Sequence, residues 1–171
     1  GGIITGGKIL TGAYASCGEI GHHVVVVDGE QCRCGRKGCW EAYASATALA
    51  AFGRRAAGLH PESALNALVS GDLEKIEAKT VFEAADLGDR AAAELTERYL
   101  TFVAEGLVNL INIFETGIIV LGGGVCARGD AILNPIREKV TDMVYGGAMQ
   151  TALKIAELGN DAGIIGAARL G

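Results

Sequence analysis

Residues 117–125 read GIIVLGGGV, a run of apolar and mainly β-branched residues that ends in three consecutive glycines. A run of this kind without alternating polar residues is typical of a buried strand, and the glycines predict a tight turn after it. Residues 89–114 before it carry apolar side chains at helical spacing, with Asp89 as a cap. Residues 130–145 after it continue as a helix capped by Asp130. The order of helix, strand, glycine turn and helix predicts an α/β fold.

Outward from this unit, the pattern predicts four further short strands and several helices. Residues 3–5 and 8–10 form a hairpin, because the pair Gly6-Gly7 supplies the positive φ angles of a two-residue turn. The β-branched run at 23–27 indicates a buried strand. The remaining predicted elements are helices at 40–44 and 45–56, the second capped by Ser45, short helices within 58–90 with a capping box of Thr80 and Glu83, a strand at 154–158 and a helix at 162–170.

Length and composition limit the classes of protein to which the chain can belong. Its 171 residues are enough for one domain, and the 50% hydrophobic and 20% charged residues fit a compact fold. A net charge of −5 without a basic cluster argues against nucleic-acid binding by this segment. No apolar run reaches the roughly 18–20 residues that span a bilayer, and no signal peptide is present, so we expect a cytoplasmic protein without a membrane partner. Because Gly1 lies inside a hairpin pattern without an initiating Met, we also expect a fragment.

Three of the five cysteines lie close together in one loop. Cys32, Cys34 and Cys39 have C-x-C and C-x4-C spacing around a turn with two glycines, which suits three thiolate ligands of a tetrahedral zinc ion. The fourth ligand is either His22 or His23, since both lie at the start of the segment that leads into the loop. Free or disulfide-bonded cysteines are the alternative, but an odd count and the strain of a C-x-C bridge disfavour a disulfide framework.

A zinc-ordered loop does not by itself decide a function. Such a loop could equally belong to a module that binds other proteins and has no affinity for sugar or nucleotide. Cys17 and Cys126 lie outside the cluster in sequence, and we expect them to be small buried residues rather than ligands.

Two acidic residues flank the predicted metal loop. Glu19 lies in the segment GEIGH at 18–22, and Glu41 follows Cys39 by two residues. If zinc ties His22 to Cys39, then Glu19, His22 and Glu41 are drawn into one small region. Carboxylates accept hydrogen bonds from vicinal hydroxyls, and a zinc-bound imidazole keeps a second N–H, so these three residues could bind a polyol. A helix cap or a surface charge is the alternative for each glutamate.

The glycines at 122–124 follow the predicted strand directly. Ligands of open α/β sheets bind at the carboxyl ends of strands, where bare backbone allows an adenine, ribose or phosphate to lie close. The pattern is neither G-x-G-x-x-G nor a P-loop, so a plain turn between strand and helix is the alternative.

In this order, the motifs resemble those of the ROK family (repressor, open reading frame, kinase). The family pattern has G-E-x-G-H followed by C-x-C-G-x-x-G-C-x-E, and this chain carries both, at residues 18–22 and 32–41. The continuation Tyr43-Ala44-Ser45 and the segment at 121–125 are also similar, and the resemblance extends over essentially the whole chain.

The resemblance implies an actin-like ATPase or ribonuclease H-like sugar kinase fold. Residues 1–171 would be its C-terminal α/β domain, with a zinc-binding insertion at about 22–41. By the same resemblance, structural zinc would be held by His22, Cys32, Cys34 and Cys39. Sugar hydroxyls would be bound by Glu19, His22 and Glu41. The nucleotide would lie against Gly1 and Gly2 of a phosphate-facing hairpin and against Gly122, Gly123 and Gly124 at the adenosine.

The resemblance also implies an activity. In such kinases ATP with Mg²⁺ phosphorylates a hexose, here with glucose favoured over N-acetylated hexosamines, mannose and fructose. The D-x-G-G-T phosphate motif and the catalytic aspartate of the family lie upstream of Gly1, in an N-terminal domain that is absent here, so we expect this segment alone to be inactive. A homodimer or homotetramer is a further expectation. The alternative within the family is the sugar-sensing domain of a transcriptional repressor.

Overall fold

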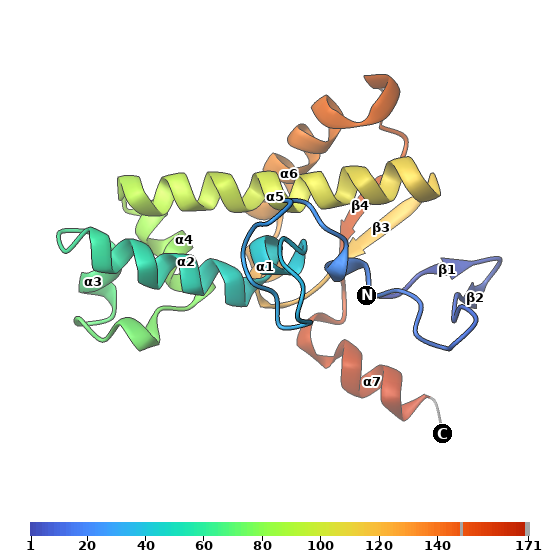
Figure 1. The fold of residues 1–171 in the computed structure, drawn as a ribbon, viewed down its shortest axis with the longest axis horizontal. Coiled ribbons are helices and arrows are strands. Elements are labelled where there is room, and N and C mark those ends of the chain that lie inside the picture. The colour runs from blue at the N-terminus through green and yellow to red at the C-terminus, as the bar shows by residue number, and fades with distance from the viewer. Residues whose placement is uncertain (148, 170–171) are drawn as a thin grey trace.

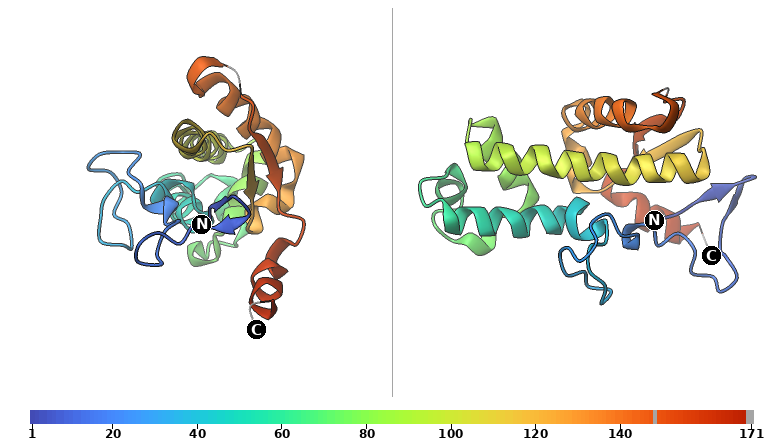
Figure 2. Two further views of the ribbon diagram at one scale, coloured as in Figure 1. Left: turned by 90° about the vertical axis from the view of Figure 1, so that its right-hand side faces the viewer. Right: turned by 45° about the horizontal axis from the view of Figure 1, so that its top comes forward.

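The computed structural model describes residues 1–147 and 149–169, which form a mixed α/β arrangement dominated by helices (Figure 1). Helix α5 (Arg90–Phe114) runs along most of the molecule. Helices α2 (Ala46–Leu59) and α4 (Ala78–Asp86) pack against it from one side and α6 (Asp130–Met143) from the other (Figures 1 and 2). The shorter elements are the helices α1 (Glu41–Ala44), α3 (Ala64–Leu68) and α7 (Ala162–Ala168), and the 3-10 segments η1 (Ile20–His22), η2 (Leu73–Lys75), η3 (Gly124–Arg128), η4 (Tyr145–Gly147) and η5 (Gly159–Asp161).

Helix α5 begins and ends where its sequence provides caps. The carboxylate of Asp89 accepts a hydrogen bond from the Ala92 N–H (2.8 Å), which satisfies a donor of the first turn. At the other end, Glu115 adopts the left-handed conformation (φ 47°), and its N–H donates to the Ile111 carbonyl. The helix predicted at 89–114 is thus confirmed. Although α5 has 25 residues, none of the described helices combines the length and apolar character needed to cross a bilayer.

One hydrophobic core joins the helices. Helix α5 contributes its largest share, and Leu153 of strand β4 (Ala152–Ile155) belongs to the same core. The most completely buried large side chains are those of Leu49, Leu65, Ile76, Val81, Leu107, Ile136 and Val140. Because these residues come from segments far apart in sequence, burial of their apolar surface holds α2 to α6 together as one unit.

Within residues 1–147 and 149–169, the strands form two separate two-stranded sheets. Strands β1 (Ile4–Thr5) and β2 (Lys8–Ile9) form the predicted antiparallel hairpin, in which Ile4 pairs with Ile9. Strands β3 (Ile118–Leu121) and β4 pair in parallel, and α6 lies on the connection between them. The predicted α/β organisation is therefore confirmed for this β3–α6–β4 unit.

The segment 23–27, His23 followed by four valines, is not a strand, and that prediction was wrong. Val24 makes only a single bridge to Cys39, and the side chain of Val27 is 82% exposed. The N–H groups of Val25 and Val26 both donate to one carbonyl, that of Gly38 (2.9 and 3.2 Å), so the chain curls around this point and cannot form a ladder. The close turn of the cysteine loop overrides the β-propensity of the valines.

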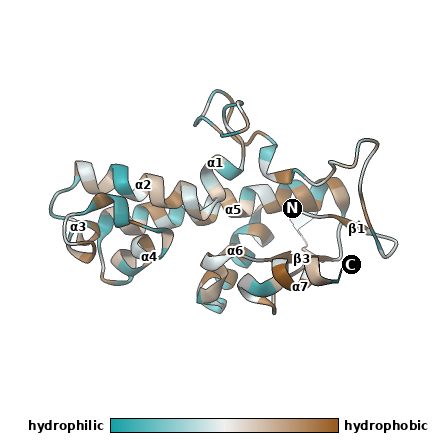
Figure 3. Cartoon of the chain, turned by 90° about the horizontal axis from the view of Figure 1, so that it is seen from below, coloured by the Kyte–Doolittle hydropathy of each residue, from teal (hydrophilic) through white to brown (hydrophobic). Residues whose placement is uncertain are grey.

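Strand β3 is less buried than its apolar sequence predicted. Ile118 and Val120 are 48% and 57% exposed, whereas Ile119 and Leu121 are half-buried against the core. Figure 3 shows the apolar character of this strand. One face of β3 therefore packs on the helices and the other face is exposed, as the alternation of side chains along a strand allows.

Several predicted element ends are shifted. The capping box of α4 is formed by Glu77 and Thr80, so Thr80 is the third residue of the helix and not its cap. Gly129 precedes α6, and Asp130 is its first residue. Strand β4 ends at Ile155, where a strand at 154–158 was predicted, and α7 ends at Ala168, where a helix to Leu170 was predicted; Leu170 lies outside the described residues.

Candidate functional site

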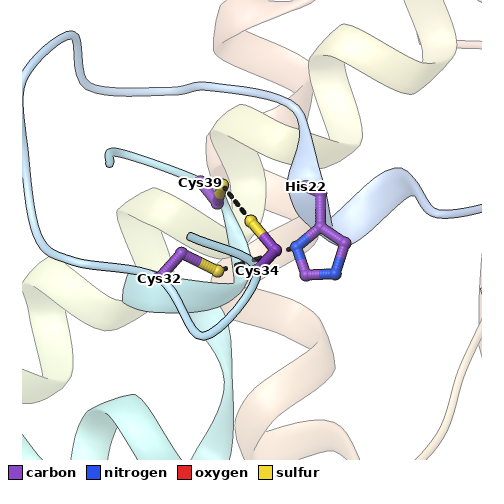
Figure 4. A group of neighbouring side chains, drawn as sticks. All are labelled: His22, Cys32, Cys34 and Cys39. Atoms are coloured by element: carbon purple, nitrogen blue, oxygen red, sulfur yellow. Dashed lines mark hydrogen bonds between the residues drawn. The ribbon is translucent and has the colours of Figure 1, made fainter. Parts of the chain in front are cut away.

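The four residues predicted as metal ligands lie together (Figure 4). His22 ends the 3-10 segment η1, Cys32 and Cys34 lie in the loop that follows, and Cys39 lies two residues before helix α1. Each offers one ligand atom, and all four atoms are within 4.8 Å of one another. Cys32 Sγ is 3.6 Å from His22 Nδ1, and Cys34 Sγ is 3.6 Å from Cys39 Sγ.

These separations fit a tetrahedral metal centre. With metal–sulfur bonds of about 2.3 Å and metal–nitrogen bonds of about 2.0–2.1 Å, two ligand atoms on one tetrahedron lie about 3.6–3.8 Å apart. Three sulfurs and one imidazole nitrogen are a donor set that zinc prefers. His23 takes no part, because its Nδ1 lies 2.5 Å from the Ile20 carbonyl. The cluster therefore could hold one ion, through His22.

The thiols of Cys34 and Cys39 have pKa values shifted in opposite directions. Burial, with the neighbouring Cys34 and Cys32, raises the pKa of Cys39 to about 11. A hydrogen bond from the Arg36 backbone N–H lowers the pKa of the exposed Cys34. Because a buried thiol with a raised pKa stays protonated at neutral pH, a bound cation is what would convert Cys39 to a thiolate.

The cysteine loop has a tight backbone path. The Cys32 N–H donates to the Arg36 carbonyl (2.8 Å), and the Gly35 N–H donates to the Cys32 carbonyl (3.1 Å). Gly35 and Gly38 have positive φ angles of 92° and 77°, and the Val26 carbonyl leaves no room for a side chain at Gly38. Glycine is therefore required at Gly38 for the chain to fold back around the ligand atoms.

Side chains from two helices fix the start of this loop. The Glu30 carboxylate accepts two hydrogen bonds from Arg55 of α2 (2.9 and 3.0 Å), and this pairing lowers the pKa of Glu30. The Glu30 N–H donates to the hydroxyl of Tyr43 in α1 (2.6 Å). The Tyr43 ring in turn packs on Phe102 of α5, with ring centroids 4.4 Å apart.

Of the three residues predicted to bind sugar, His22 belongs to the metal cluster, and Glu19 and Glu41 lie beside it. Glu19 Oε2 is 3.9 Å from His22 Nε2, the ring nitrogen that does not face Cys32. Glu41 lies in the first turn of α1, and a Cβ placed on Gly21 would be 3.5 Å from its Oε2. Glu41 thus approaches the segment that carries Glu19 and His22. Both carboxylates are exposed, so they are accessible to a ligand.

The predicted nucleotide glycines lie in two places. Gly124 lines a cavity of about 680 Å³ between α2, α4 and η3. Gly123, with φ 102°, and Gly122 form the turn between β3 and this cavity wall. Gly1, at the base of the hairpin, lies against Gly18 and Ile20, next to Glu19, and Gly2 follows it. The cavity wall also contains Arg54, Lys79, Phe82 and Arg128.

Sequence reasoning missed these cavity residues and the loop anchors. Arg54, Lys79 and Arg128 come from three separate elements, and no spacing rule joins them. The ion pair of Glu30 and Arg55 was missed for the same reason. Cys17 is exposed, contrary to expectation, and Cys126 is half-buried.

The fold and the site define a class of protein. It is a mixed α/β protein with a loop able to bind one metal ion, acidic residues beside that loop and a glycine turn at the end of a parallel strand. The sequence profile of the ROK family matches residues 1–171, and the chain belongs to the ROK family. Its fold is the ROK sugar kinase fold, of the actin-like ATPase class.

The similar proteins include kinases and a repressor. A glucokinase of Thermotoga maritima is 39% identical over 171 residues, which cover 99% of this chain and 54% of that protein. A crystal structure of a ROK family glucokinase from Streptomyces griseus in complex with glucose and AMPPNP is 36% identical, with a TM-score of 0.88 over 99% of this chain and 56% of that one. A xylose repressor of Bacillus spizizenii is 28% identical over 84% of this chain and 33% of its own length. The chain thus spans about half the length of the kinases it matches.

Proposed function

We propose that this chain is the sugar-binding C-terminal domain of an ATP-dependent hexose kinase, with glucose as the favoured substrate. The observation that carries the proposal is the position of Glu19 and Glu41 beside His22, which belongs to a cluster of three cysteines and one histidine whose ligand atoms lie within 4.8 Å of one another. Identity of 39% to a glucokinase and a TM-score of 0.88 to a glucokinase that binds glucose support the same assignment.

In the proposed site, His22, Cys32, Cys34 and Cys39 would hold a structural zinc ion, which would fix the loop and one tautomer of His22. Because Nδ1 is the ring nitrogen of His22 that faces Cys32, it would be the ligand atom, and the N–H at Nε2 would be left to donate to a sugar hydroxyl. Glu19 and Glu41 accept hydrogen bonds from other hydroxyls of the same sugar. The three groups therefore bind and orient the hexose.

The nucleotide is placed by the glycines and the cavity. Gly122, Gly123 and Gly124 allow adenosine to lie close to the backbone at the end of β3, and the apolar wall with Phe82 suits a purine. The cavity wall has mixed charge, because Glu77 and Glu83 line it together with Arg54, Lys79 and Arg128. Each of these three cations pairs with a carboxylate, so the proposed placement of the nucleotide rests on the glycines and on the apolar wall. Gly1 and Gly2 belong to the phosphate-facing hairpin of the same site, where ATP is bound with Mg²⁺. AMPPNP, an analogue of ATP, is bound by the Streptomyces griseus glucokinase.

The general base for phosphoryl transfer is an aspartate in a preceding N-terminal domain in this proposal, so residues 1–171 alone do not turn over. The complete kinase acts in the cytoplasm as a homodimer or homotetramer. The second candidate is the sugar-sensing domain of a ROK repressor, which the 28% identity to a xylose repressor favours.

The test compares Glu41→Gln with Glu138→Gln in the full-length gene product. Glu138 is exposed on α6, outside the cluster. Loss of a charge-assisted hydrogen bond should raise the KM for glucose on the order of 10- to 100-fold in Glu41→Gln and leave Glu138→Gln unchanged. A repressor would instead bind sugar without glucose-dependent hydrolysis of ATP. Equal KM values for the two variants would refute the assigned role of Glu41.

A further inference from the structure

We propose that His23 and Trp40 form a positioning pair, which fixes the distance between the two segments that carry the sugar-binding residues. One segment is η1 with Glu19 and His22, and the other is the start of α1 with Glu41. This inference rests on the proposed function of those three residues. Neither His23 nor Trp40 would be a ligand of metal or sugar; each acts through the residue beside it.

Trp40 fixes the second segment to α5. It lies between Cys39 and Glu41, and its indole Nε1–H donates to the Phe102 carbonyl (2.6 Å). Gly106, one turn along α5, faces the ring so closely that a Cβ there would lie inside the indole. Only glycine at this position allows the Trp40 ring to approach the helix backbone. The surface of α5 at Gly106 therefore forms a binding position for the indole.

His23 fixes the first segment to the same helix. Its Nδ1 donates to the Ile20 carbonyl (2.5 Å), and its Nε2 accepts from the side-chain amide of Asn109 on α5 (3.4 Å). This tautomer is assigned from the two partners, since a carbonyl accepts only and an amide nitrogen donates only. The ring therefore closes η1 on one side and reaches α5 on the other.

The two anchors also contact each other. The rings of His23 and Trp40 pack with centroids 5.3 Å apart, and the backbone N–H of Trp40 donates to the His23 carbonyl (2.8 Å). Phe102, Gly106 and Asn109 are spaced by four and three residues, which places them along one face of α5. The two segments are thus tied to one rigid face and to each other.

A purely space-filling role would not use these polar groups. Both rings are only half-buried, yet each directs an N–H to a backbone carbonyl. When one anchor is lost, Glu41 is free to shift relative to Glu19, and a small misplacement of binding groups weakens their joint hold on a ligand strongly. Sugar affinity should therefore fall, while nucleotide affinity should not.

The experiment measures the KM for glucose and for ATP, glucose affinity by calorimetry and zinc content in the full-length gene product. Trp40→Phe removes the indole donor, and His23→Phe removes both imidazole partners. Each should raise the KM for glucose about tenfold, with the KM for ATP unchanged and one zinc per chain. His23→Asn keeps a donor for Ile20 and should recover part of the loss.

Leu65→Ala is the matched control, because Leu65 is a fully buried core residue of α3, which packs on α4 and α2 away from the pair. It should lower stability without a change in the KM for glucose. If Trp40→Phe fails to fold, the KM for glucose of Asn109→Leu tests the proposal instead, since this substitution removes only the side-chain amide that His23 faces. The double variant His23→Phe/Trp40→Phe should raise the KM for glucose by less than the product of the two single increases. If the increase equals that product, the two residues act independently and the proposed positioning pair is refuted.

The outcomes separate the two proposals. The positioning pair alone is refuted if glucose affinity is lost in Glu41→Gln but is retained in Trp40→Phe, His23→Phe and Asn109→Leu. No glucose binding by the unaltered protein, or none lost in Glu41→Gln, overturns the proposed function and the pair with it.

Discussion

Replacing Gly106 by alanine should destabilise the protein by about 1–5 kcal/mol, although alanine is the better helix former. A Cβ at Gly106 would overlap the Trp40 ring, with Cε2 as its nearest atom. The ring would have to move by more than about 1 Å to regain van der Waals separation. The move breaks the bond to the Phe102 carbonyl, at about 1–3 kcal/mol if the indole N–H stays unpaired, and strains the packing by about 1–3 kcal/mol. The higher helix propensity of alanine offsets about 1 kcal/mol of this destabilisation.

Urea unfolding of the full-length gene product, followed by circular dichroism, measures this difference. The matched control is Gly58→Ala in α2, where a Cβ meets nothing within 4 Å. Alanine should stabilise that exposed helical position by about 0.5–1 kcal/mol. Gly53→Ala tests an intermediate case, since its Cβ would lie 2.6 Å from Val81 Cγ2. If Gly106→Ala is as stable as Gly58→Ala, the close packing of the Trp40 ring on Gly106 is refuted.

Three further predictions concern the metal loop and the helix caps. A chelator should remove one metal ion per chain and abolish amide-exchange protection at 22–41; native protection after complete metal removal would contradict this. Cys34→Ser should lower the melting temperature more than Cys126→Ser, because Cys126 is outside the cluster, and equal melting temperatures would count against the metal site. Asp89→Ala should cost about 1–2 kcal/mol at neutral pH, since the Asp89 carboxylate caps α5 and also accepts from the Ala64 N–H (2.8 Å). Burial opposes ionisation of Asp89, but hydrogen bonds from Ala92, Ser63 and Ala64 outweigh it and hold its pKa below the usual value. A lowered pKa means that the contribution is complete above about pH 4 and is lost as pH falls through the folded-state pKa. The difference in urea midpoint between the native protein and Asp89→Ala should therefore close in that acidic range, and a constant difference would refute it.

The sequence predicted best those features that depend on neighbours along the chain. The period of apolar residues in 89–114 identified α5, and Gly6-Gly7 identified the hairpin. Ser45 was predicted as a cap, and its hydroxyl accepts from the Ala48 N–H (3.1 Å). In each case a local rule of periodicity, turn geometry or capping is sufficient.

Features that depend on distant partners could not be predicted in this way. The valines at 24–27 have the composition of a strand, but a ladder needs a partner strand, and Gly38 offers them a single carbonyl. The cavity beside Gly124 is assembled from α2, α4 and η3, and its basic residues are not adjacent in sequence. The choice of His22 over His23 as a candidate ligand came from family resemblance, because spacing alone allowed both. The direction of the two rings, set by Ile20 and Cys32, makes the distinction.

Helix α5, rather than a sheet, supports the candidate sugar site. The sheets described here have two strands each, and one face of β3 is exposed, so they can constrain the acidic residues little. The half of α5 that receives Trp40 and His23 is also the half whose opposite face is most buried, at Val103, Leu107 and Ile111. Core packing thus fixes the helix, and the helix fixes the rings beside Glu19 and Glu41. Substitutions in this stretch of the core that tilt α5 should therefore change sugar affinity from a distance. Substitutions that only lower stability, without a tilt of α5, should leave sugar affinity unchanged.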